Sequence, residues 1–201
     1  MTMTRSEETV ERILATARRL FLDHNYADVS VDRIARETEV TKGGIYHHFA
    51  SKEELYLAML RADFEHLAAL FEEATAPPGS CREKLARLTR AFLSLSPIER
   101  RVMRLVRRDI NTFDDPARAE LIRGYQRALP ERIEELLHEG FERGELRRSD
   151  PRLLSWCFVA LVEVALTPYA DTVFEDLEHK LEFVLDQFFH GAVPRDEEPS
   201  A

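Results

Sequence analysis

The chain has 201 residues, of which 44% are hydrophobic and 32% are charged, and its formal net charge is −9. These proportions are ordinary for a soluble helical protein of one large or two modest domains. No apolar run reaches membrane-spanning length, and the first residues, MTMTRSEE, have no signal-peptide core, so we expect a cytoplasmic protein. Cys81 and Cys157 occur without a CxxC pattern, which argues against a disulfide framework or a cysteine metal site.

A first helix is predicted from about Ser6 to His24. Its apolar residues recur at helical spacing: Val10, Ile13, Leu14, Ala17, Leu20 and Phe21. Asn25 can take the left-handed position that ends such a helix, and Tyr26 is expected to be a core residue of the following turn.

Two short helices are predicted next, within residues 30–49. Ser30 is a candidate N-cap of the first helix, which has Ile34 on its apolar edge. Thr41 is a candidate N-cap of the second, in which Ile45 and Phe49 are four residues apart and therefore share one face. The helical period places Lys42, Gly43, Tyr46 and His47 on the opposite face. The pair is predicted to be a helix-turn-helix motif.

The free face of the second helix has the chemistry needed to enter a DNA major groove. Gly43 and Gly44 each cost about 1 kcal/mol of helix stability relative to alanine, so a close approach to a ligand is a reason for them. Lys42, Gly44 and His47 are assigned to base edges, and Tyr46, His48 and Lys52 to phosphates. The predicted DNA contacts are Ser30, Arg33, Thr41, Lys42, Gly43, Gly44, Tyr46, His47, His48 and Lys52. The alternative is a loop followed by a core helix, with ordinary surface groups.

This segment resembles the DNA-binding domain of TetR-type transcriptional repressors, over roughly Ser6 to Leu67. The matching residues are Val40, Thr41, Gly43, Ile45, Tyr46, His48 and Phe49, followed by Lys52, Glu53 and Leu55. The family usually has glycine in the turn where this chain has Glu39. Either Glu39 is left-handed, at a cost on the order of 1 kcal/mol, or the turn is built differently. The segment GFERGELR, residues 140–147, also resembles the end of a helix in these proteins.

The charge distribution agrees with a DNA-binding N-terminal end. Residues 1–52 have eight basic and eight acidic side chains, so the whole acidic excess lies after residue 52. An acidic body would repel DNA and would turn the neutral end toward it.

The remainder is predicted to be helices separated by caps and prolines. Ser51 with Glu54 is predicted to open a long helix to about Ala74, and residues 76–79, Ala-Pro-Pro-Gly, form the clearest break. Capping boxes or Asp-Pro pairs mark later starts: Ser80 with Glu83, Ser96 with Glu99, Asp115-Pro116 and Asp150-Pro151. Pro130 is expected to kink or divide a helix.

Two late helices indicate a homodimer. Residues 153–166 are almost entirely apolar, with Glu163 as the only charge, and a second apolar stripe runs from Val173 to His190. We expect both helices to pair with their two-fold mates as a four-helix bundle. The predicted interface residues are Leu154, Phe158, Leu161, Val162, Leu177, Leu181, Val184 and Phe188. The alternative is that these helices form only the intrachain core.

A dimer of helix-turn-helix motifs would read an inverted-repeat operator, with half-sites about 34–36 Å apart or a multiple of that distance. Operator affinity should fall steeply as the salt concentration rises.

In the TetR-type family the C-terminal helices enclose a pocket whose ligand releases DNA. The resemblance therefore implies a small-molecule effector, and the candidate lining is Phe92, Met103, Leu105, Val106, Phe113, Leu121, Tyr125 and Phe158. The run Arg100, Arg101, Arg104, Arg107 and Arg108 could hold an anionic ligand with an apolar tail, such as a fatty acyl thioester. The alternatives are that the aromatic residues are core and that the arginines form a solvated face.

Other classes of function have little support in the sequence. No HExxH, Gly-rich phosphate loop or Gly-x-Ser-x-Gly occurs, so no catalytic residue, metal ligand or cofactor is assigned. An all-helical enzyme and a helical protein-interaction module remain as alternatives. The expected fold class is all-α with about nine helices. We expect a helix-turn-helix domain at 1–52, an effector-binding and dimerisation domain at 53–192, and a disordered tail at 193–201.

Overall fold

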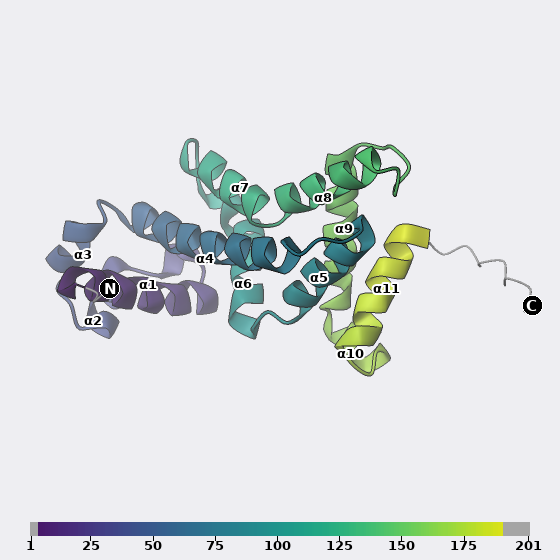
Figure 1. Cartoon of the computed structure of the whole chain (residues 1–201). Coiled ribbons are helices and arrows are strands. Elements are labelled where there is room, and N and C mark those ends of the chain that lie inside the picture. The colour runs from purple at the N-terminus through teal and green to yellow at the C-terminus, as the bar shows by residue number, and fades with distance from the viewer. Residues whose placement is uncertain (1–3, 191–201) are drawn as a thin grey trace, which may run out of the picture. The chain divides into compact units, whose positions relative to one another are not determined.

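The structure is a computed structural model, and it describes residues 4–190 (Figure 1). Within that range it contains α-helices, two short 3-10 helices and no strand, which confirms the all-α class. The elements are α1 (Arg5–Asp23), η1 (Tyr26–Asp28), α2 (Val31–Thr38), α3 (Lys42–His48), α4 (Lys52–Thr75), α5 (Cys81–Leu93), α6 (Pro97–Asp109), η2 (Ile110–Thr112), α7 (Ala117–Ala128), α8 (Pro130–Glu142), α9 (Pro151–Ala165), α10 (Pro168–Val173) and α11 (Leu177–His190). No helix among these residues is both long enough and apolar enough to cross a membrane. The predicted tail lies outside the described residues.

The chain packs as two compact units. Of the described residues, the first unit contains those from Thr4 to Ala68 together with Leu95–Ala128, and the second contains Ala69–Ser94 together with those from Leu129 to His190. Helices α6 and α7 therefore pack with α1 to α3 and the first part of α4. The functional division of the chain at residue 52 stays a prediction, because packing groups the residues differently.

The first unit has a core of aliphatic and aromatic side chains. Ile13, Ala17 and Leu20 of α1 are fully buried, as the helical spacing predicted. An aromatic cluster adjoins them. The rings of Tyr26 and Tyr56 contact each other, and each of them also contacts the rings of Phe21 and Phe113. This cluster joins α1, η1 and α4 to the segment that follows η2.

A buried hydrogen bond closes this core. The Tyr56 hydroxyl donates to Oδ2 of Asp109 over 2.7 Å, and Arg108 donates to the same carboxylate from Nε and Nη2, each over 2.8 Å. Burial and the bond to Asp109 raise the pKa of the Tyr56 phenol well above its ordinary value. The phenol is therefore a hydrogen-bond donor at all physiological pH values.

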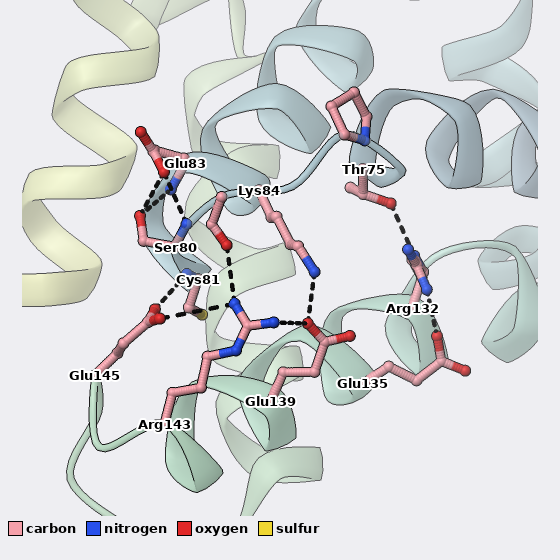
Figure 2. Close-up of polar contacts among 12 residues, drawn as sticks. Thr75, Ser80, Cys81, Glu83, Lys84, Arg132, Glu135, Glu139, Arg143 and Glu145 are labelled. Carbon is pink, nitrogen blue, oxygen red and sulfur yellow. Dashed lines mark hydrogen bonds and ion pairs between the residues drawn. The ribbon is translucent and has the colours of Figure 1, made fainter.

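In the second unit, polar side chains form hydrogen bonds and ion pairs between the start of α5 and the end of α8 (Figure 2). The Cys81 backbone N–H donates to Glu145 and Nζ of Lys84 donates to Glu139, both over 2.5 Å. Arg143 donates to the carbonyl of Gly79 over 3.0 Å. A Cβ at Gly140 would come within 3.0 Å of the Cys81 side chain, so this glycine allows α8 to approach closely. These contacts join the start of α5, and the last residue of the Ala-Pro-Pro-Gly break, to the end of α8.

Most predicted helix starts are confirmed. The capping boxes at Ser80 and Ser96 form as expected, and Asp150 caps α9. Ser51 caps α4 by accepting from the N–H of Glu54, although the Glu54 carboxylate bonds the N–H of residue 50 and not that of the serine.

The remaining boundaries are corrected or refined. Pro130 divides the predicted seventh helix into α7 and α8, as expected. The predicted Asp115 cap is wrong, because α7 begins only at Ala117. The predicted last helix also begins too early: Thr167 caps the separate helix α10, and Asp176 accepts the N–H of His179 over 3.0 Å to start α11.

Candidate nucleic-acid interface

The two short helices form where the sequence predicted them, because local caps define both starts. The Ser30 hydroxyl accepts the Arg33 N–H over 3.2 Å at the start of α2. The Thr41 hydroxyl accepts the Gly44 N–H over 2.9 Å at the start of α3. Ile45 of α3 is buried, so α3 is anchored by its apolar face. Helix α2 packs against both α1 and α3 (Figure 1).

Of the two possibilities for the turn between α2 and α3, the structure shows the left-handed one. Glu39 has φ 59° and ψ 36°, which is the left-handed conformation that glycine adopts most readily. Its backbone N–H ends α2 by bonding the carbonyls of Ala35 and Arg36. The free energy cost of the left-handed Glu39 is offset by this hydrogen bonding and by the packing of α2 against α3.

Replacing Glu39 by glycine is expected to stabilise the protein by about 0.5–1 kcal/mol, because the relief of left-handed strain outweighs the entropy that the unfolded chain gains. Gly144 provides the matched opposite case, since it has φ 71° and an added Cβ would meet no atom within 4 Å. Gly144→Ala should destabilise the protein by a similar amount. Urea unfolding measures both changes, and equal signs for the two variants would contradict this explanation.

The face of α3 opposite Ile45 is exposed over Lys42, Gly43, Tyr46 and His47. Tyr46 is 44% exposed, although it is a large aromatic residue. A Cβ at Gly43 would meet nothing nearer than the Thr41 hydroxyl at 4.0 Å. Within the described residues, the protein itself therefore gives no steric reason for glycine at position 43, whereas close approach of a duplex would.

Lys42 lies at the N-terminal end of this exposed face. Its Nζ is 2.8 Å from Oδ2 of Asp32, and this hydrogen bond raises the pKa of the lysine. Both side chains are exposed, so solvent screens the pair and a phosphate can replace the carboxylate at little cost.

Two predicted contacts have other partners. Nζ of Lys52 donates to the carbonyls of Tyr26 over 2.8 Å and Val29 over 3.0 Å, and lies 4.1 Å from the centre of the Tyr26 ring. Desolvation lowers the pKa of Lys52. Lys52 thus holds the turn before α2, and only one of its three ammonium hydrogens is left for a phosphate. Arg33 is held by Glu37 over 3.1 Å and by the ring of His24.

Arg12 is a positioning residue that the sequence analysis missed. Its Nη2 donates to the carbonyl of Thr38 over 2.7 Å, so α1 satisfies an end carbonyl of α2. Nothing in the sequence marks this role, because the two residues are brought together only by the tertiary fold.

The predicted effector lining is distributed over both units. Met103, Val106, Phe113 and Leu121 are buried and Tyr125 is half-buried in the first unit, and Arg104 is exposed there. Phe92 and Phe158 are buried in the second unit, where Phe92 stacks on Phe71 and Phe158 contacts Phe188. The side chain of Arg107 lies outside the described part of the chain. Phe113 and Phe158 therefore have core partners, as the alternative interpretation required.

The residues of the predicted dimer interface differ in how much of their surface the chain itself covers. Phe158, Val162, Leu181 and Val184 are buried within their own unit, so they have little surface to offer a partner, and Leu154, Leu161, Leu177 and Phe188 are half-buried. The large apolar side chains exposed on α9 and α10 are instead Leu153, Trp156, Val164, Tyr169 and Val173. Because α9 is apolar all round, the sequence did not reveal which side faces inward.

An anchored α2 followed by an α3 with an exposed polar face defines a helix-turn-helix DNA-binding protein. The family model for bacterial regulatory proteins of the tetR family matches residues 13–59, and that for the tetracyclin repressor-like C-terminal domain matches residues 78–169. The chain belongs to the TetR family of transcriptional regulators.

Individual relatives agree with this assignment. The transcriptional repressor AcnR of Corynebacterium glutamicum is 40% identical over 63 residues, which are 31% of this chain and 34% of AcnR. The chain thus spans about a third of the length of this curated relative.

Solved structures match the fold over most of the chain. FadR from Bacillus subtilis, in complex with stearoyl-CoA, has a TM-score of 0.73 at 20% identity, covering 90% of this chain and 98% of FadR. A putative regulator from Saccharomonospora viridis, in complex with choline, has a TM-score of 0.73 at 25% identity, covering 94% and 99%. The ligands of these two proteins differ in chemical class.

Proposed function

We propose that the protein is a ligand-responsive transcriptional repressor that binds an inverted-repeat operator as a homodimer. The observation that carries the proposal is the exposed face of α3, on which Lys42, Gly43, Tyr46 and His47 lie opposite the buried Ile45. This face combines a cation, a glycine without a side chain, and two aromatic residues that can form hydrogen bonds. Such groups on one anchored helix can contact the phosphates and the base edges of DNA.

The homodimer is supported by the exposed apolar side chains of α9 and α10. Trp156 is 50% exposed, Val164 is 55% exposed and Tyr169 is 76% exposed. Helices α9 and α10 follow each other in the chain. Large apolar side chains that are exposed on adjacent helices are typical of an interface between subunits. A two-fold dimer would present two copies of α3 to one side of a duplex.

Two solved structures of similar fold bear on the chemical class of the effector. The FadR complex with stearoyl-CoA supports a small apolar or amphipathic effector, such as a fatty acyl thioester, while the choline complex supports a different class. Native mass spectrometry of the purified protein separates the two. A co-purified acyl thioester supports the first class, and a ligand without acidic groups contradicts it.

Selection of genomic DNA fragments by the purified protein tests the operator. We expect the enriched sequences to share an inverted repeat with half-sites on one face of the duplex. Enrichment that fails to occur, or that shows a single half-site, would contradict a dimeric operator-binding protein.

The interface is tested by the reactivity of the two thiols. Cys157 is exposed within the chain and follows the exposed Trp156 on α9, whereas Cys81 is buried and burial raises its pKa to about 12. We expect a thiol reagent to modify Cys157 quickly in dilute protein and progressively more slowly as the concentration passes through the dimer dissociation constant. Cys81 is the internal control and should react only on unfolding. A Cys157 rate independent of protein concentration would contradict this interface.

A further inference from the structure

A small hollow lies between the last turn of α1 and one face of α6, within the first unit. Its volume is about 220 Å³, and it is lined by Leu22, Arg101, Arg104, Leu105 and Arg108. The four residues from α6 recur at helical spacing, so the helical period places them on one face. The hollow therefore collects three guanidinium groups and two apolar side chains.

Two of these arginines hold the C-terminal end of α1. Arg101 donates from Nη2 to the carbonyl of Leu22 over 2.6 Å. Arg108 donates from Nη2 to the carbonyls of Phe21 over 2.8 Å and His24 over 3.1 Å. A helix end needs such donors, and cations are favoured there, but α1 has no basic residue in its own last turn. Helix α6 supplies them instead.

The three arginines retain binding capacity. Arg104 is exposed and has no hydrogen bond or ion pair with any residue that the structure describes. Arg101 is paired with Asp23 and Arg108 with Asp109, and both pairs use Nη2 of the arginine. The Nη1 groups take no part in these contacts. Three guanidiniums against two carboxylates leave a positive charge at the hollow.

We propose that this hollow binds a phosphate-bearing anion, such as a pyrophosphate or phosphate-monoester group, and that binding loosens the hold of α6 on α1. Guanidinium groups match phosphate oxygens in a bidentate geometry and bind them more strongly than they bind neutral carbonyls. The volume is below the roughly 300–1,000 Å³ of pockets for drug-sized ligands, so it suits a small anionic group.

The expected coupling follows from the shared donors. An anion that draws Arg101 and Arg108 toward the hollow competes with the carbonyls of α1, and α1 packs against α2. The binding site itself goes beyond the proposed function. Only the consequence for operator affinity rests on it.

Isothermal titration calorimetry of the full-length protein with sodium pyrophosphate, without DNA and at constant ionic strength, tests the site. We expect saturable binding that Arg104→Ala weakens about tenfold or more, because a charged hydrogen-bonding group is lost. Arg123→Ala is the matched control, since Arg123 is an exposed arginine of α7 outside the hollow. No heat of binding, or equal weakening by both substitutions, would overturn the site.

A second arm measures operator affinity with and without saturating pyrophosphate at the same ionic strength. A several-fold loss of affinity supports the coupling, and unchanged affinity in the presence of bound pyrophosphate overturns it. Because the calorimetric arm contains no DNA, failure of the anion site and failure of the operator proposal give different results.

Discussion

Alanine at both Lys42 and Tyr46 is expected to weaken operator binding by roughly a hundredfold, since each contact contributes on the order of 1–3 kcal/mol. Both side chains are exposed, and the pair of Lys42 with Asp32 is solvent-screened, so the free energy of unfolding should change by less than about 0.5 kcal/mol. A fluorescence-anisotropy titration with operator DNA measures the affinity. Removal of the lysine should also reduce the slope of log affinity against log salt by about one.

The control for this prediction is Arg123→Ala, which removes one cation from α7 without touching α3. Its operator affinity should stay within a factor of about two of the unmodified protein. A double variant of Lys42 and Tyr46 that melts well below the unmodified protein would instead identify the two residues as structural. In that case the interpretation of the α3 face would be wrong.

Asp109→Ala is expected to lower the free energy of unfolding by about 2–3 kcal/mol. Asp109 is 3% exposed and its carboxylate accepts hydrogen bonds from Tyr56 and Arg108. Its removal leaves the buried Tyr56 hydroxyl without this acceptor and the partly buried Arg108 guanidinium without its carboxylate partner. For a chain of this size the melting temperature should fall by roughly 4–12 °C. Differential scanning calorimetry provides the measurement.

Asp114→Ala is the matched control, because Asp114 is an exposed aspartate a few residues further along the same segment. We expect a change of less than about 0.5 kcal/mol for it. Similar losses for Asp109→Ala and Asp114→Ala would show that the buried acceptor is not what stabilises this region.

Features controlled by neighbouring residues could be predicted from the sequence. Ser30, Thr41 and Ser80 each cap a helix by accepting from the N–H three residues further along, so their pattern is complete within a few positions. The family pattern also left two possibilities for Glu39, a left-handed conformation or a turn built differently, and the structure shows the first. The N-terminal motif could therefore be recognised without coordinates.

Features that depend on distant partners could not be predicted. The sequence assigned Asn25 to a left-handed helix end, but Asn25 is extended with φ −65°, and α1 ends under the arginines of α6. Lys52 looked like a phosphate ligand because the carbonyls of Tyr26 and Val29 are more than twenty residues away in the chain. Long cationic side chains have too many possible acceptors for sequence alone to choose among them.

The arginines of α6 also bear on protein engineering. Hybrid regulators can be constructed by joining the helix-turn-helix domain of one protein to the C-terminal domain of another. A junction placed just after residue 52 would separate α1 from Arg101 and Arg108, and Tyr56 from its own N-terminal neighbours. The transplantable module of this protein is discontinuous, and a working hybrid should import residues 95–113 along with the N-terminal helices.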